Sequence, residues 1–179
     1  MSRIIGIDVS TRKVACVLLD YPDWQVVEFV SKAKDWQGRL DELQEQFWIF
    51  LRDIVTQDDR IFIEDIPYVQ NAQALIRLVH VVAMCRTVAT FFNCDFRYVN
   101  NLTWKQRVVG SGRASKEDIA DKAQILYGEE RTKHLSQDSL DALLIATYGQ
   151  ITINYEKWKT YDSMREHYKG VLDGRLPVN

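Results

Sequence analysis

The chain has 179 residues, of which 46% are hydrophobic and 27% are charged, the composition of an ordinary globular domain. The 23 basic and 25 acidic side chains give a formal net charge of −2, so the overall charge predicts no polyanionic partner. Eight glycines, three prolines and three cysteines exclude collagen-like, low-complexity and disulfide-scaffold proteins.

The first third of the chain is predicted to form strands and one helix. Three short runs rich in Ile and Val, at 3–9, 13–20 and 25–30, are separated by turn-compatible residues. This spacing predicts an antiparallel meander. Apolar residues then recur with the period of a helix over 37–55, followed by a short apolar run at 60–66 that ends in two acids.

The remainder is mostly helical in pattern. An almost wholly apolar helix is predicted at 71–93 and a short strand at 96–99, and then helices at 102–109, 115–127, 136–153 and 155–171. The third of these six elements ends at Gly110-Ser111-Gly112, and the fourth opens with a capping box of Ser115 and Asp118. We therefore expect an α/β fold with a mixed five-stranded sheet, three antiparallel strands followed by parallel strands, flanked by helices. Residues 1–154 would form this domain, and 155–179 a helical extension packed on or near it.

The three cysteines lie in apolar runs without C-x-x-C spacing, which favours buried thiols in a reducing compartment. The most apolar window, 75–92, contains Arg77 and Arg86, and each Arg at the centre of a bilayer would cost roughly 2.5–3.5 kcal/mol. We expect a cytoplasmic protein with no membrane span.

Four acids occupy positions where acids are unusual: Asp8 and Glu64 at strand ends, and Asp138 and Asp141 three apart near the start of an apolar helix. If the fold brings them together, their mutual repulsion favours a hard divalent cation, and two such ions about 3.5–4 Å apart suit phosphodiester hydrolysis. Each acid alone has an ordinary explanation. Asp8 can be a turn residue, Asp65 competes with Glu64 for the inward direction, and Asp138 can simply favour the helix dipole.

The charge is unevenly distributed. Residues 96–116 carry five basic side chains and no acid, whereas 35–65 carry nine acids against three arginines. The basic stretch can follow a phosphate backbone through its cationic side chains and loop amides, or it can be a solvated loop and helix face. Its members are Arg97, Lys105, Arg107, Arg113 and Lys116.

Four segments together resemble the RuvC-type Holliday junction resolvases of the ribonuclease H-like superfamily. They are Ile4-Ile5-Gly6-Ile7-Asp8, Ile63-Glu64-Asp65, the stretch from Lys105 to Gly112 with Lys116, and Asp138-Ser139-Leu140-Asp141-Ala142-Leu143. The resemblance covers about residues 3 to 150, in order, and the K-Q-x-V-V-G-x-G stretch is its most specific part.

The resemblance implies a homodimeric, Mg²⁺- or Mn²⁺-dependent endonuclease of DNA recombination and repair, without a small-molecule cofactor. It would nick a four-way junction in pairs and leave 5′-phosphate and 3′-hydroxyl ends. Asp8, Glu64, Asp138 and Asp141 would bind the cations, two for each active site, and Lys105 and Lys116 would offset charge at the scissile phosphate. The helix at 71–93 would form the dimer. Candidate DNA contacts are Arg12, Lys13, Tyr68, Arg107 and Arg113.

The sequence departs from the family at two places. Val9-Ser10 replaces the usual Pro-Gly, and Pro67 stands where an aromatic residue probes the junction, with Tyr68 beside it. Such departures are similar to phage-type members. The alternatives are a nuclease of this fold that cuts branched or flap DNA or an RNA–DNA hybrid, and a non-catalytic junction-binding relative.

Overall fold

The computed structural model describes residues 3–66 and 70–172, the stretch 167–172 through its backbone alone. The chain divides into two compact units, 1–149 and 150–179. The predicted boundary lay after residue 154, and the packing of the extension on the first unit stays a prediction.

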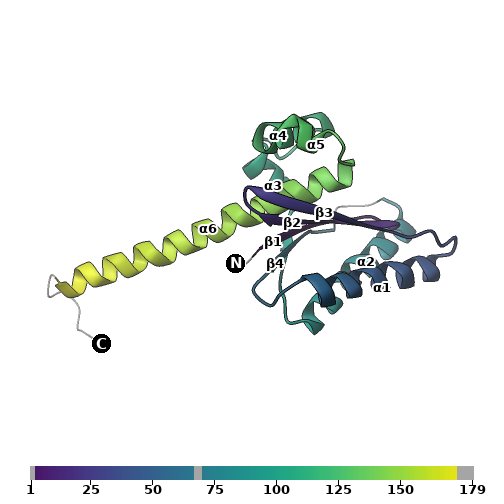
Figure 1. The fold of residues 1–179 in the computed structure, drawn as a ribbon, viewed down its shortest axis with the longest axis horizontal. Coiled ribbons are helices and arrows are strands. Elements are labelled where there is room, and N and C mark those ends of the chain that lie inside the picture. Colours follow the sequence, from purple (N-terminus) through teal and green to yellow (C-terminus); the bar gives the residue numbers. More distant parts are fainter. Residues whose placement is uncertain (1–2, 67–69, 173–179) are drawn as a thin grey trace. The chain divides into compact units, whose positions relative to one another are not determined.

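The first unit contains one mixed five-stranded sheet, as the sequence predicted (Figure 1). Its strands are β1 (Ile4–Val9), β2 (Lys13–Asp20), β3 (Asp23–Val30), β4 (Arg60–Glu64) and β5 (Asp95–Val99), in the order β3-β2-β1-β4-β5. The pairs β1–β2 and β2–β3 are antiparallel, and β1–β4 and β4–β5 are parallel. Because Ile7 of β1 lies beside Ile63 of β4, the acids that follow them, Asp8 and Glu64, lie at the same edge of the sheet.

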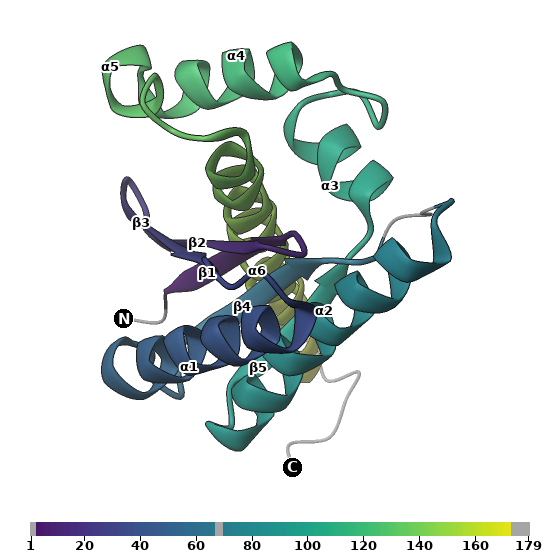
Figure 2. The ribbon, with the colours of Figure 1, turned by 90° about the vertical axis from the view of Figure 1, so that its right-hand side faces the viewer.

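Helices cover both faces of this sheet (Figure 2). One face carries α1 (Trp36–Ile54) and α2 (Ala72–Phe91). On the other side are the first turns of α6 (Gln137–Leu172), with α3 (Asn101–Val108), α4 (Lys116–Tyr127) and α5 (Glu129–Thr132) beyond. The predicted capping box of Ser115 and Asp118 is confirmed at the start of α4.

The core under α1 and α2 is apolar and rich in aromatic rings. Phe47 and Phe50 of α1 make edge-on or tilted contacts with Phe29 of β3 and with each other. Six side chains of α2 are buried in the same core. By length and composition alone α2 could cross a membrane. Its buried face instead packs within the domain, as that of a core helix does.

On the opposite face, α6 approaches β1 so closely that only glycine fits at one position. A Cβ atom at Gly6 would lie 2.1 Å from the carbonyl oxygen of Ala142 and 2.4 Å from the amide nitrogen of Ala146. Backbone atoms cannot move aside as side chains do, so Gly6 sets the distance between β1 and α6.

Two details of the predicted helices were wrong. The stretches 136–153 and 155–171 form one helix, α6, because no Gly or Pro lies between 150 and 168 and a change from apolar to mixed composition does not end a helix. The short helix α5, which follows Gly128 at a φ of 88°, was not predicted. The other predicted elements differ from the observed ones only in their end residues.

Candidate active site

Three acids that are distant in sequence line one pocket at the carboxyl ends of β1 and β4. Asp8, Glu64 and Asp141 border a pocket of about 220 Å³. Val9, Asp65, Ile66, Leu78, Val82 and Asn101 complete its lining. The predicted convergence of the strand-end acids with an acid of the apolar helix is therefore present in the structure.

The local sequence explains why these acids meet. Asp8 and Glu64 end two parallel strands in register. Asp141 is brought to them by α6, because its neighbour Ala142 lies directly over Gly6, two residues before Asp8. The glycine in the first strand is thus a condition for the geometry of the site.

The electrostatics of the pocket disfavour three ionised acids. Burial, followed by the charges of Asp141, Glu64 and Asp138, raises the pKa of Asp8 well above its ordinary value. Burial also raises the pKa of Asp141 to about 6, against the lowering effect of a hydrogen bond from Gln137. A divalent cation reverses the sign of these repulsions, so the pocket has the charge of a cation site.

Glu64 is held by residues of α3. Burial raises its pKa, while the amide of Asn101, the charge of Lys105 and the indole of Trp104 act in the opposite direction. The Nδ2 atom of Asn101 donates a hydrogen bond to Oε1 of Glu64. Trp104 is fully buried, and its Nε1 makes no hydrogen bond of full geometry in the described structure. Three residues of one short helix therefore act on this carboxylate.

Asp138 lies one turn before Asp141 but does not line the pocket. Its Oδ2 atom is 2.9 Å from the Nζ atom of Lys13 at the start of β2. The same ammonium donates to Oγ of Ser136 at 3.1 Å and to Oε1 of Glu28 at 3.3 Å. Asp138 is thus close enough to raise the pKa of Asp8, yet its charge is paired with a lysine.

The donor chemistry of the pocket fits a hard divalent cation, since Asp8, Glu64 and Asp141 offer only carboxylate oxygens. Within residues 3–66 and 70–166, however, no group of three or more His, Cys, Asp or Glu side chains is placed as metal ligands are. The reason lies in the neighbours: Gln137 donates to Asp141 at 3.0 Å, and Asn101 donates to Glu64. These donors hold the carboxylates in the arrangement that the chain adopts by itself.

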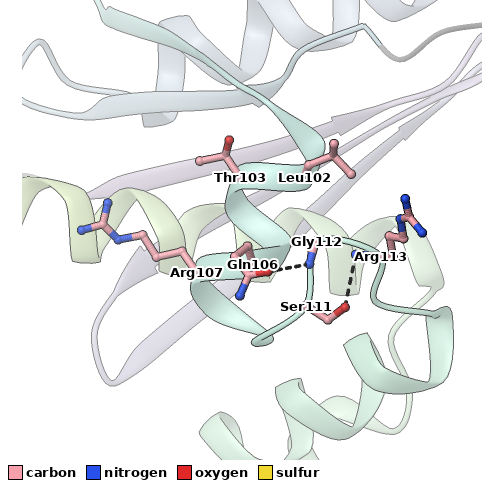
Figure 3. Close-up of a pocket in the computed structure, with 7 residues that line it drawn as sticks. All are labelled: Leu102, Thr103, Gln106, Arg107, Ser111, Gly112 and Arg113. Carbon is pink, nitrogen blue, oxygen red and sulfur yellow. Dashed lines mark hydrogen bonds between the residues drawn. The ribbon is translucent and has the colours of Figure 1, made fainter.

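The predicted basic residues lie in different surroundings. Arg107 and Arg113 line a second, open pocket of about 780 Å³ formed by α3 and the loop before α4. Figure 3 shows their guanidinium groups extending to opposite sides of it. Gly112 donates its amide to Gln106 Oε1 at 3.2 Å, which fixes the loop against α3.

The remaining predicted residues are spread around the acids. Lys105 acts electrostatically on both Glu64 and Asp141. Lys116 is exposed at the first position of α4, and no hydrogen bond or ion pair in the described residues joins it to the acids. Arg12 is exposed in the turn after β1. Tyr68 lies outside the described residues.

Sequence reasoning did not identify Asn101, Trp104 or Gln137 as part of this site. A signal exists for two of them. Asn101 stands four residues before Lys105, and Gln137 four residues before Asp141, so each shares a helix face with a residue that was identified. The contact of Lys13 with Asp138 has no such signal, because 125 residues separate them.

The sheet order and the flanking helices define an α/β protein with the ribonuclease H-like fold. No protein-family model matches the sequence. Over 151 residues the chain is 31% identical to the crossover junction endodeoxyribonuclease RuvC of Sulfurovum sp., an alignment that covers 80% of this chain and 92% of that relative. RuvC of Citrifermentans bemidjiense is 25% identical over 151 residues, with 80% and 88% covered. The chain belongs to the RuvC family.

Two solved structures show the same fold. Thermus thermophilus RuvC in complex with a Holliday junction substrate superposes with a TM-score of 0.70 at 14% identity, covering 83% of this chain and 92% of that one. Thermus thermophilus RuvC alone gives 0.67 at 17% identity, covering 86% and 96%. The predicted family and fold are confirmed.

Proposed function

We propose that this protein is a crossover junction endodeoxyribonuclease, which resolves four-way DNA junctions by paired, metal-dependent hydrolysis of phosphodiester bonds. The observation that carries the proposal is the pocket in which Asp8, Glu64 and Asp141 meet. The relationship to curated RuvC proteins over four-fifths of the chain supports the choice of substrate.

Asp8, Glu64 and Asp141 would hold the divalent cation, Mg²⁺ or Mn²⁺, with Asp138 as the fourth acid beside them. The bound cation would activate water and stabilise the leaving oxygen, the latter two tasks being shared where a site holds two ions. The chain's own contribution is positional: Asn101 directs Glu64, Gln137 directs Asp141, and burial keeps competing water away from the carboxylates.

Lys105 is the basic residue best placed to help the reaction. Its charge already acts on Glu64 and Asp141, so it lies near the bond to be cut in this proposal. A fixed positive charge there would stabilise the additional negative charge of the phosphoryl transition state. We propose Lys116 as a second cation that approaches the phosphate from the start of α4.

The open pocket beside α3 supplies the surface for the DNA backbone. Arg107 and Arg113 lie at its two sides, and the loop between α3 and α4 offers amides between them. We propose that both arginines contact phosphates, as does Arg12. Contacts of Lys13 and Tyr68 with DNA stay predictions.

A second copy of the chain would complete the enzyme. Ile76 and Val79 of α2 are 49% and 40% exposed, although the other face of the same helix is buried in the core. An apolar face of this kind is suited to a homodimer, in which two active sites related by a two-fold axis match the symmetry of a four-way junction. We place this activity in the cytoplasm, where DNA-processing relatives act.

The experiment is a cleavage assay on a synthetic mobile four-way junction with and without Mg²⁺, next to duplex, flap and RNA–DNA hybrid substrates. We expect symmetric paired nicks on the junction alone, with 5′-phosphate ends and only with the cation. Asp8→Asn and Glu64→Gln should abolish cleavage but retain junction binding in a gel-shift assay. Preferred cleavage of a flap or hybrid would favour another nuclease of this fold. No cleavage of any substrate would indicate a non-catalytic relative.

A further inference from the structure

Lys13 is buried more deeply than a surface lysine of a strand end. Its side chain is 20% exposed, and its ammonium has three oxygen partners: Asp138 at 2.9 Å, Ser136 at 3.1 Å and Glu28 at 3.3 Å. An ammonium has three N–H donors, so these contacts occupy its full donor capacity.

The partners of Lys13 are themselves anchored. Glu28 of β3 accepts a hydrogen bond from Ser139 Oγ at 2.6 Å and another from Ser136 Oγ. Ser136 also accepts from the amide of Ser139 at 3.2 Å, as the cap of α6. The ammonium therefore lies between a fixed strand and the fixed first turn of a helix, and little side-chain freedom remains to be lost when it pairs with Asp138.

This network separates Asp138 from the three acids of the pocket. Asp138 and Asp141 lie on the same side of α6, but only Asp141 lines the pocket with Asp8 and Glu64. For Asp138 to bind a divalent ion, it would have to leave a charged hydrogen bond of 2.9 Å, and the ammonium of Lys13 would lose its closest partner. A partly buried charge left without its partner is costly.

We propose that Lys13 is a built-in counter-ion that withholds Asp138 from the cation pocket, so that Asp8, Glu64 and Asp141 alone hold the catalytic ion. The inference rests on the proposed function and deepens it, because it changes the predicted ligand set from four acids to three. Asp138 is then a positioning residue, which fixes Lys13 and the start of α6, and Lys13 supplies to this acid the positive charge that a second cation would supply.

The test measures binding of Mn²⁺ to the full-length protein without DNA, by isothermal titration calorimetry and by electron paramagnetic resonance of the free ion. Asp141→Asn should weaken Mn²⁺ binding by at least about 10-fold, as removal of a ligand does, whereas Asp138→Asn should leave it within about 3-fold of the parent. Lys13→Met should bind Mn²⁺ about 10-fold more tightly, since it frees Asp138 to act as a ligand.

Two variants serve as matched controls. Lys13→Arg retains the positive charge and should bind Mn²⁺ like the parent. Lys133→Met makes the same chemical change at the exposed ion pair of Lys133 with Glu130 and should also have no effect. The change in Mn²⁺ affinity then belongs to the position of Lys13 and not to the loss of one positive charge from the protein.

The inference is overturned if Asp138→Asn weakens Mn²⁺ binding as much as Asp141→Asn does, or if Lys13→Met fails to strengthen it. Either result leaves the proposed nuclease in place, with Asp138 as a true ligand. Failure of the parent protein to bind Mn²⁺ at millimolar concentration would overturn both the inference and the proposed function.

Discussion

Two acids at opposite ends of the same parallel strand pair behave in opposite ways. Asp59 precedes β4, and Asp8 lies near the end of β1. Asp59 is fully buried, and burial by itself would raise its pKa, but hydrogen bonds from Arg3 and from the amide of Thr56 outweigh this effect and lower the pKa. Asp8 is partly buried among other acids, and its pKa is raised.

The difference lies in the partners. The guanidinium of Arg3 meets Asp59 at 2.6 Å, and the backbone amides of Arg3 and Thr56 meet it at 2.9 Å each. Asp8 has instead the negative charges of Asp141 and Glu64 as neighbours. A buried acid with its counter-charge in the chain stabilises the fold, whereas a group of acids without one is a site that awaits a cation.

The largest expected effect comes from Gly6→Ala, which attacks only the acidic end of the comparison. The new Cβ would lie 2.1 Å from the carbonyl oxygen of Ala142, so α6 must move away from β1. We expect a loss of about 3 kcal/mol in the free energy of unfolding, measured by urea denaturation, together with loss of Mn²⁺ binding.

A second substitution shows whether the backbone clash is the cause. Adding Ala146→Gly removes the neighbouring methyl group at 2.9 Å but leaves the backbone atoms in place, so it should restore little stability. Full recovery in the double variant would mean that β1 and α6 are less closely fixed than the structure indicates.

At the other end of the strands, Asp59→Asn should destabilise the protein by about 2–3 kcal/mol, because it removes the counter-charge of Arg3 and one acceptor of a shared network. Asp58→Asn, an exposed neighbour, is the matched control and should change the free energy of unfolding by less than about 0.5 kcal/mol. Equal effects of the two variants would remove the structural role of Asp59.

The same pair predicts a dependence on pH. Because the pKa of Asp59 is lower in the folded protein than in the unfolded chain, its contribution is complete above the unfolded pKa of about 3.9 and is lost as the pH falls through the folded pKa. The free energy of unfolding should therefore fall below about pH 4 in the parent, and less steeply in Asp59→Asn. An equal slope in both proteins would contradict this account.

The sequence predicted the acidic end of the comparison better than the other. Asp8 and Glu64 end apolar runs, and a strand that ends in an acid is visible without a structure. Asp59 stands in a polar stretch with Gln57 and Asp58, and nothing in the pattern marks it as buried. Its partner, Arg3, is 56 residues away, so the pair exists only once β1 and β4 are side by side.

The same reason limits the predicted site. The strand order follows from short connections and apolar runs, and it places Asp8 next to Glu64. That Asp138 is paired with Lys13 while Asp141 faces the pocket depends on the rotation of α6 over the sheet. The close approach at Gly6 sets this position, and spacing along the helix does not contain it.

A smaller effect, of opposite sign, is expected for Asp8→Asn. Removing one of several mutually repelling acids should stabilise the metal-free protein by about 1 kcal/mol, in the way that many active-site residues oppose stability. Thermal unfolding in EDTA should show a higher Tm than that of the parent, and added Mn²⁺ should raise the Tm of the parent only. A lower Tm in EDTA would show that Asp8 supports the fold as Asp59 does.

The smallest expected effect separates two adjacent asparagines. Asn101→Ala removes the donor that directs Glu64 and should weaken Mn²⁺ binding by about 10-fold, with little change in stability. Asn100→Ala removes the cap of α3, which accepts from the amides of Leu102 and Thr103, and should cost about 1 kcal/mol of stability without changing the affinity for Mn²⁺. If both substitutions weaken Mn²⁺ binding equally, Glu64 depends on the integrity of α3 as a whole. If only Asn101→Ala does so, one hydrogen bond from a residue outside the acid set orients a carboxylate for the cation.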